Sequence, residues 1–398
     1  MLITLLLMII YLAFISMGLP DSLLGSTWPA MYEQMNVPVS YAGVLSMIIS
    51  AGTILSSFFS DRLICRLGTG VVTAGSVCMT AAALLGFSYG NSFGIVCLWA
   101  IPLGLGAGSV DAALNNFVAQ HYPAKHMNWL HCFWGIGATA GPVILSFWLA
   151  RGKEWIMGYR TIGLVQLALS AILVLALPLW KKVEQEAVLK RSEVLQMEEK
   201  AECSGVVPVG SLLSLPGVKA VLVAFFCYHA VEMTIGLWSG SYLVLCRHVE
   251  AAAAAGFVSL FYVGMTGGRL AAGFLTDWLN ERQMIRLGQI ILATGVLLTA
   301  AGTTELLLKA AFLVMGAGCA PIYPSLLHAT PGNFGYQHCQ AIMGLQMSAA
   351  YVGTTCMAPL FGVLGGRFGY GLFAVYVLVL LGVMAGMVEK VNRSIGSR

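Results

Sequence analysis

The stretch "SSFFSDRLICRLG" (residues 56–68) ends one apolar run of the chain, and "RLAAGFLTDWLNERQMIRLG" (residues 269–288) ends another. In each, a small residue stands four positions before an aspartate, Asp61 or Asp277, and arginines follow. Two further pairs recur in the same order: "GAGSVD" (106–111) with "GAGCAP" (316–321), and "GP" (141–142) with "AP" (358–359). The recurrences predict two similar halves with the same orientation.

The halves consist of runs that are long and apolar enough to cross a membrane. Hydrophobic residues make up 58% of the 398 residues and charged residues only 10%, whereas soluble domains carry about 25% charged residues. A spanning helix needs about 20 mainly apolar residues. Twelve such runs are found, near residues 3–33, 39–60, 69–90, 93–120, 128–150, 158–180, 215–246, 252–276, 284–303, 306–330, 337–364 and 368–389. The sequence predicts an all-α integral membrane protein with twelve helices.

A charged segment, "KKVEQEAVLKRSEVLQMEEKAECSGVVPVGSL" (residues 181–212), separates the runs six and six. We therefore expect an N-terminal six-helix bundle over residues 1–180, a linker over 181–212 and a C-terminal six-helix bundle over 213–398. Parallel repeats of this kind are the plan of transporters whose site lies at the midplane between the halves.

The basic residues predict the orientation in the membrane. If the spans alternate, one side receives Arg62, Arg66, Lys125, Lys181, Lys182, Lys190, Arg191, Lys200, Arg282, Arg286, Lys390, Arg393 and Arg398, and the other only Arg151, Lys153, Arg160, Arg247 and Arg367. The richer side is cytoplasmic by the positive-inside rule, so we expect both termini and the linker there. We interpret the opening run as the first span of a multi-pass cell-membrane protein, which in a bacterium is the inner membrane, because it lacks the basic start and cleavage site of a signal peptide.

Composition also excludes several kinds of partner. The net charge is only +4, so nucleic acid is not expected. The 10 cysteines lie mostly inside apolar runs and show no paired metal spacing. We therefore expect no cofactor and no metal, and a monomer in the lipid bilayer.

The chain resembles the major facilitator superfamily in the two stretches after its second and eighth spans. "SDRLICRLG" and "GGRLAAGFLTDWL" are similar to the superfamily's loop signature and its repeat. The first copy departs from the signature with Ser57 in place of the usual glycine. The second keeps Gly273 but has Trp278 in place of the usual arginine.

Within the superfamily, the chain is similar to the fucose–proton symporter family of sugar permeases. The similar stretches are "LGAGSVDAALNNF" in the fourth span, "HMNWLHCFWGIGATAGP" in the fifth, "MGLPDSLLG" in the first and "EMTIGLWSGSYLV" (232–244) in the seventh. The resemblance implies a small-molecule solute, a sugar, moved together with a proton.

Three acids lie well inside the spans: Asp21, Asp111 and Glu232. A charge at the bilayer centre costs about 2.5–3.5 kcal/mol on insertion scales, so each acid needs a reason to be there. No lysine or arginine lies beside them in their own helices. A carboxyl group in such a place is suited to gain and lose a proton as its surroundings alternate between wet and dry. We expect these three acids to couple proton movement to transport.

Each acid has a structural alternative. Asp111 and Asn115 are four apart and share a helix face with Gly104 and Gly108, which let another helix approach closely. Asp111 would then only fasten two helices. Asp21 follows Pro20 and would cap a new helical segment. Glu232 would pair with His229, which stands three residues before it.

Other polar and aromatic residues complete the expected site. Candidate solute contacts are Asn115, His131, Trp134, Trp238 and Gln346. Asn and Asp suit a sugar because each hydroxyl both donates and accepts hydrogen bonds. Expected gating residues, which would hold the halves together, are Asp61, Arg62, Arg66, Arg269 and Asp277.

These features predict a secondary transporter of a sugar or related polyhydroxy solute, working by proton symport and alternating access. The alternative on the same fold is an exporter of drugs or metabolites by proton antiport, against which the neighbouring Asn115 and Asn116 argue. An intramembrane enzyme is disfavoured, because "GSVD" is not the G-x-G-D of membrane aspartyl proteases and no H-E-x-x-H helix occurs.

Overall fold

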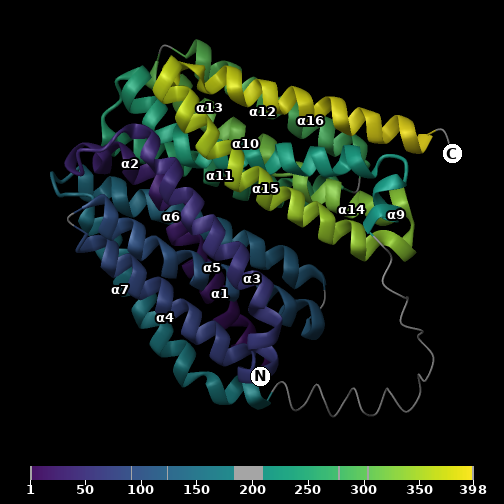
Figure 1. Cartoon of the computed structure of the whole chain (residues 1–398), viewed down its shortest axis with the longest axis horizontal. Coiled ribbons are helices and arrows are strands. Elements are labelled where there is room, and N and C mark those ends of the chain that lie inside the picture. The colour runs from purple at the N-terminus through teal and green to yellow at the C-terminus, as the bar shows by residue number, and fades with distance from the viewer. Residues whose placement is uncertain are drawn as a thin grey trace. The chain divides into compact units, whose positions relative to one another are not determined.

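The computed structural model describes residues 2–90, 92–122, 124–182, 209–276, 278–302 and 304–396. Every regular element in these ranges is a helix (Figure 1). The longer ones are α1 (Leu2–Asp21), α2 (Leu23–Gln34), α3 (Ala42–Leu67), α4 (Thr69–Ser88), α5 (Phe93–His121), α6 (Ala124–Leu149), α7 (Ile156–Leu175), α10 (Val218–Arg247), α11 (Ala251–Leu275), α12 (Glu281–Ala301), α13 (Glu305–Cys319), α14 (Ile322–Phe334), α15 (Tyr336–Phe368) and α16 (Phe373–Gly396). Short helices are η1 (Val39–Tyr41), α9 (Val209–Ser214) and η2 (Tyr370–Leu372).

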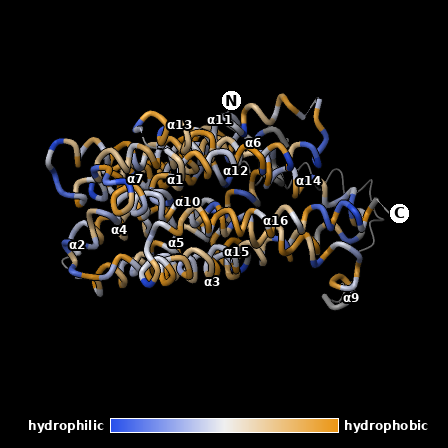
Figure 2. Tube along the Cα trace, turned by 90° about the horizontal axis from the view of Figure 1, so that it is seen from above, coloured by the Kyte–Doolittle hydropathy of each residue, from blue (hydrophilic) through white to orange (hydrophobic). Residues whose placement is uncertain are grey.

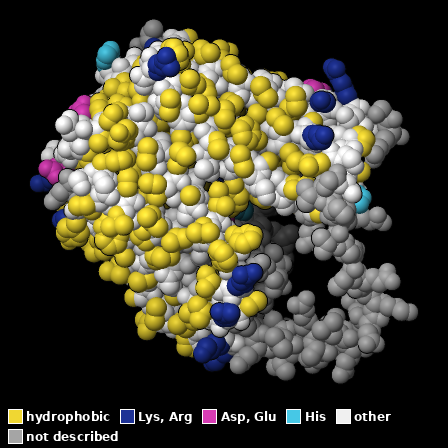
Figure 3. Space-filling view, viewed as in Figure 1, with side chains coloured by type: hydrophobic (Ala, Val, Ile, Leu, Met, Phe, Trp, Pro, Cys, Tyr) yellow, Lys and Arg dark blue, Asp and Glu magenta, His cyan; other side chains and the backbone are white. Residues whose placement is uncertain are grey.

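Twelve stretches of the described residues are long and apolar enough to cross a membrane, which confirms the predicted fold class. Hydrophilic residues gather at helix ends along the trace (Figure 2). Hydrophobic side chains spread over the face drawn in Figure 3, while lysines and arginines lie toward its edges. Most of the expected linker, residues 183–208, lies outside the described residues, so the predicted domain boundaries stay a prediction.

Two of the spans are interrupted, each at a proline. α1 ends at Asp21, directly after Pro20, and α2 begins at Leu23. α13 ends at Cys319, and α14 begins at Ile322 after Pro321. A proline lacks a backbone donor and its ring crowds the preceding turn, which favours an interruption there. Irregular backbone inside a membrane protein is tolerated where it is buried in protein or lines a water-filled cavity.

Contacts divide the chain into two compact units. Unit 1 comprises Met1–Asp21, Ile48–Gly141 and Ile156–Gly205, and unit 2 comprises Ser22–Met47, Pro142–Trp155 and Val206–Arg398. Unit 2 therefore contains two segments from the first half of the chain. They are fastened to its later helices: α2 packs on α10, and Ser146 Oγ of α6 donates a 2.8 Å hydrogen bond to the Ala252 carbonyl of α11.

The internal repeat appears as equivalent helix pairs. α4 packs on α5 and α7 in unit 1, and α12 packs on α13 and α16 in unit 2. Glycines produce close crossings in both: a Cβ added at Gly108 of α5 would overlap the Thr53 carbonyl of α3, and one added at Gly316 of α13 would overlap the Phe261 carbonyl of α11. Small residues are what allow membrane helices such close approach.

The letter-by-letter match of "GAGSVD" with "GAGCAP" is nevertheless wrong in space. Gly106 faces α4 and Gly108 faces α3, whereas Gly316 faces α11 and Gly318 faces α12. Since α11 is the equivalent of α3, and α12 that of α4, matched glycines point to opposite neighbours. The faces agree only when the second motif is shifted by two residues, because a helix turns by about 200° over that distance.

Candidate functional site

The first candidate site lies in unit 1, where the interrupted first span meets α6. The two helices cross so closely that a Cβ at Gly18 would overlap the Trp134 carbonyl, and one at Gly137 would overlap the Ile15 carbonyl. This crossing brings Asp21 to the indole of Trp134, whose Nε1 donates a 2.7 Å hydrogen bond to Asp21 Oδ2. The structural alternative made Asp21 the N-cap of a new helix. The structure contradicts this, because Asp21 ends α1 and Ser22 is the residue that precedes α2.

Asp111 and Asn115 form the second part of this site, on α5. Asn115 Nδ2 donates to Asp111 Oδ1 at 2.8 Å and to the Asp111 carbonyl at 3.0 Å, as their spacing of four residues predicts. Both side chains are half-buried. The second carboxylate oxygen of Asp111 and the amide oxygen of Asn115 have no hydrogen-bond partner among the described residues.

The charge of Asp111 acts on the Asp21 carboxyl group. Asp21 and Asp111 are close enough to interact electrostatically, and within the described ranges neither forms an ion pair with lysine or arginine. Two negative charges without a cation repel each other, so binding one proton to the pair relieves the repulsion. His131, another candidate, packs edge-on against Phe14 with ring centroids 6.0 Å apart.

A second polar cluster lies in unit 2, around the interruption between α13 and α14. Tyr228 of α10 donates a 3.2 Å hydrogen bond to the carbonyl of Cys319, the last residue of α13. The charge of Glu232, one helical turn further along α10, also acts electrostatically on Tyr228. Tyr323, on the first turn of α14, stacks on Tyr228 with ring centroids 6.0 Å apart. The sequence reasoning missed both tyrosines, although Tyr228 stands four residues before Glu232.

His229 does not pair with Glu232 as the structural alternative proposed. Its Nδ1 lies 3.1 Å from the carbonyl oxygen of Phe225 in the preceding turn. Arg269 and Glu232 both act electrostatically on Tyr228, His229 and Cys319. Arg269 is therefore within electrostatic reach of the cluster that contains Glu232, and its expected gating role stays a prediction.

Two other candidate solute contacts are enclosed within unit 2. Trp238 is fully buried, and its Nε1 donates a 2.7 Å hydrogen bond to the Ala358 carbonyl. Gln346 is also fully buried, and its Nε2 donates to Thr330 Oγ1 at 3.0 Å. Their polar atoms are used inside the protein in this structure, so their role in solute binding stays a prediction.

Two of the remaining gating candidates lie near a helix end. Arg62 and Arg66 are exposed near the end of α3, which continues as a helix to Leu67 where the sequence suggested a loop. The Asp61 side chain and all of Asp277 lie outside the described residues. The gating role of these four residues therefore stays a prediction.

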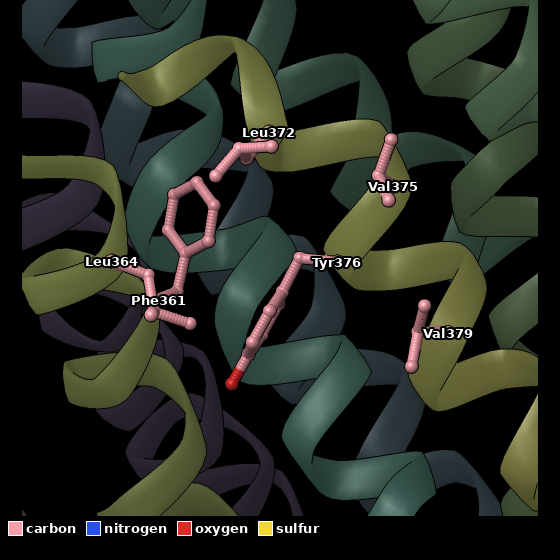
Figure 4. Close-up of a pocket in the computed structure, with 6 residues that line it drawn as sticks. All are labelled: Phe361, Leu364, Leu372, Val375, Tyr376 and Val379. Atoms are coloured by element: carbon pink, nitrogen blue, oxygen red, sulfur yellow. The ribbon is translucent and has the colours of Figure 1, made fainter. Parts of the chain in front are cut away.

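One apolar pocket of about 170 Å³ lies between α15 and α16 and is lined by Phe361, Leu364, Leu372, Val375, Tyr376 and Val379 (Figure 4). The Tyr376 hydroxyl donates to the Met357 carbonyl at 2.7 Å. With no polar group left to orient a solute, this pocket lacks the chemistry of a specific binding site. Among the described residues, no group of three His, Cys, Asp or Glu is placed to hold a metal ion.

Two solved structures of transporters have a similar fold. The crystal structure of a D-xylose-proton symporter has a TM-score of 0.75 at 13% sequence identity, covering 97% of each chain. A bacterial homologue of the human lysosomal transporter Spinster, in an inward-facing and occupied conformation, has a TM-score of 0.73 at 12% identity, covering 98% of this chain and 97% of that one. At such identities the likeness shows the fold alone.

Two relatives are similar in sequence. The uncharacterized transporter y4wD of Sinorhizobium fredii is 24% identical over 312 residues, covering 76% of this chain and 78% of the relative. Bypass of stop codon protein 6 of Saccharomyces cerevisiae is 24% identical over 290 residues, covering 68% of this chain but only 56% of the yeast protein's length. The family model of the Major Facilitator Superfamily matches residues 10–338, and this protein therefore belongs to that superfamily of membrane transporters, which are not enzymes.

Proposed function

We propose that this transporter carries a sugar or related polyhydroxy solute together with a proton, by alternating access. The observation that carries the proposal is the group of Asp21, Trp134, Asp111 and Asn115 in unit 1. Asp21 and Asp111 interact and form no ion pair with a described lysine or arginine, so binding a proton relieves the repulsion between them. The open carboxylate and amide oxygens accept hydrogen bonds from solute hydroxyl groups. A solved structure with this fold is a D-xylose-proton symporter, so the fold is compatible with this kind of solute and ion.

The test compares Asp111→Asn with the wild-type protein in proteoliposomes. The probes are radiolabelled sugars, including D-xylose and L-fucose. Asparagine keeps the size of the side chain but cannot release a proton. We expect Asp111→Asn to exchange the sugar across the membrane in counterflow and to fail to accumulate it under an imposed proton gradient. Ser109→Ala, on the same helix, is the control and should accumulate the sugar as the wild type does.

Three outcomes would contradict the proposal. Gradient-driven accumulation at the wild-type level by folded Asp111→Asn would remove Asp111 from proton coupling, and Asp21→Asn would be tested next. Export of the sugar against its gradient would indicate antiport. Failure of the wild-type protein to bind any sugar of the panel would exclude a sugar as the solute.

We further propose that both termini and the segment 181–212 face the cytoplasm of a cell membrane. The asymmetry of lysine and arginine between the two sides supports this orientation. Arg62 and Arg66, at the exposed end of α3, would then face the cytoplasm with Asp61 and Asp277 and hold the two halves together when the cytoplasmic side is closed.

A further inference from the structure

His229 is held in a fixed orientation by three aromatic side chains. Its ring lies edge-on to Tyr228, with centroids 5.0 Å apart and an interplanar angle of 84°. It lies edge-on to Tyr323 as well, at 5.4 Å and 87°, and stacks on Phe225 at 6.3 Å. These contacts, together with the hydrogen bond of Nδ1, leave the imidazole little freedom to rotate. Its second nitrogen therefore points in one set direction.

The hydrogen bond of Nδ1 determines what the second nitrogen, Nε2, is able to do. The partner of Nδ1 is the Phe225 carbonyl oxygen at 3.1 Å, and a carbonyl oxygen only accepts hydrogen bonds. Nδ1 must therefore carry the hydrogen. In the neutral imidazole the lone pair then lies on Nε2, which makes Nε2 an acceptor.

This acceptor is left unused within unit 2. None of the described residues forms a hydrogen bond to Nε2, and the His229 side chain is half-buried rather than enclosed. By contrast, the neighbouring Tyr228 hydroxyl has a partner in the protein, because it donates a hydrogen bond to the Cys319 carbonyl. An oriented, unpaired acceptor among aromatic rings is suited to receive a hydrogen bond from a ligand.

The charges around His229 favour a neutral ligand. Glu232, on the same helix, and Arg269, on α11, both act electrostatically on His229. Their charges are opposite, so the cluster as a whole has no excess of either sign. Tyr228 of α10, Tyr323 of α14 and Cys319 of α13 are the other titratable groups that the structure places around the cluster.

We propose that His229 binds the solute in the second half of the protein, with its Nε2 accepting a hydrogen bond from one hydroxyl group of a neutral polyhydroxy solute. This inference rests on the proposed sugar transport and deepens it. It assigns to His229, on α10 of unit 2, a role in recognition of the solute rather than in proton coupling.

Three substitutions separate this role from a structural one. His229→Phe keeps a ring in the aromatic cluster but removes both nitrogens. His229→Asn reaches only the Nδ1 position, whereas His229→Gln extends to the Nε2 position with an oxygen that accepts hydrogen bonds. His328→Gln is the matched control, because His328 lies on α14 with 81% of its side chain exposed.

The measurement is the affinity of each purified variant for D-xylose, L-fucose and their monodeoxy analogues. For the sugar that the wild-type protein binds, we expect one monodeoxy analogue to bind about tenfold more weakly, the effect of losing one hydrogen bond. His229→Phe and His229→Asn should bind this analogue and the parent sugar equally. His229→Gln and His328→Gln should still prefer the parent sugar.

Accumulation under a proton gradient provides the second readout. At saturating sugar, His229→Phe should reach the wild-type accumulation ratio, since recognition and coupling are separate in this proposal. The proposal is overturned if folded His229→Phe distinguishes every analogue as the wild type does, or if it binds sugar normally but no longer accumulates it. If the wild-type protein binds none of the sugars, the proposed function itself fails, a result visible before any variant is compared.

Discussion

The indole of Trp134 on α6 donates a hydrogen bond of 2.7 Å to the carboxylate of Asp21, the residue at which the first span is interrupted. Pro20 favours the interruption, and the glycine crossing of α1 with α6 sets the distance between the helices. The same carboxylate interacts electrostatically with Asp111 of α5. Trp134 thereby links the interrupted first span to two acids, Asp21 and Asp111, that form no ion pair with any described lysine or arginine.

Replacing Trp134 by phenylalanine tests the role of this hydrogen bond in transport. We expect Trp134→Phe to fold and to transport about tenfold more slowly, because the Asp21 carboxylate loses a donor worth about 1.5 kcal/mol. Initial uptake rates in proteoliposomes give the measurement. Trp129→Phe, on the same helix but with its side chain 50% exposed, is the control and should be unchanged. Equal rates for both variants would show that the Trp134 hydrogen bond has no part in transport.

The crossing of α3 and α5 predicts a stability effect at Gly108. A Cβ there would overlap the Thr53 carbonyl and crowd the Ser57 hydroxyl. We expect Gly108→Ala to lower the free energy of unfolding by about 1–3 kcal/mol, the usual cost of overpacking. Thermal unfolding in detergent measures this against Gly75→Ala, where the added methyl group would meet nothing within 4 Å. A melting temperature unchanged from that control would contradict the close crossing.

The sequence predicted the twelve spans and the two repeats because span length and hydropathy are local properties of the chain. It also predicted the pairing of Asp111 with Asn115, since residues four apart on a helix share a face. Contacts between helices were harder to predict. The Ser57 hydroxyl, which replaces the glycine usual in the superfamily signature, donates a 3.1 Å hydrogen bond to the Gly108 carbonyl, and its partner is 51 residues away.

The site in unit 2 shows the same limit. The sequence identified Glu232 as an acid inside a span. It did not identify the residue that interacts with Glu232, because this depends on which neighbouring side chain faces the carboxyl group. The histidine three residues earlier bonds the backbone instead, and the charge of Glu232 acts on Tyr228 in the preceding turn. Trp238 and Gln346 were chosen for their chemistry, yet both are enclosed by their own half of the chain. Burial of this kind depends on the packing of distant helices, which residue spacing along one helix does not reveal.

The proposed orientation predicts where an added epitope is accessible. An epitope inserted after residue 195 should bind antibody only after the cells are permeabilised, as should an epitope at the C-terminus. An epitope inserted after Gly152, between α6 and α7, should bind without permeabilisation. Binding to the linker epitope on sealed cells would reverse the orientation.

The packing of α2 on α10 predicts an effect on the conformational cycle. A Cβ at Gly25 would overlap the Gly236 carbonyl, so valine at position 25 forces the two helices apart. We expect Gly25→Val to open the packing between α2 and α10 and to slow transport at least tenfold, because the valine side chain does not fit at this backbone contact. Labelling of a single cysteine placed at Ser239, which is fully buried, reports the opening. Gly75→Val is again the control. Normal transport by Gly25→Val would show that this contact is dispensable.

Glu232 and Arg269 supply the last prediction, because they surround the same three residues with opposite charges. Removing one of two opposite charges that act on the same groups leaves the other charge uncompensated, whereas removing both is often nearly neutral. We therefore expect Arg269→Gln alone to lower the melting temperature more than the double variant Glu232→Gln/Arg269→Gln. Thermal unfolding of the wild type, both single variants and the double variant forms a complete cycle. Additive changes in melting temperature would show that the two residues do not interact. The expected roles of Arg269 in gating and of Glu232 in proton coupling would then stand.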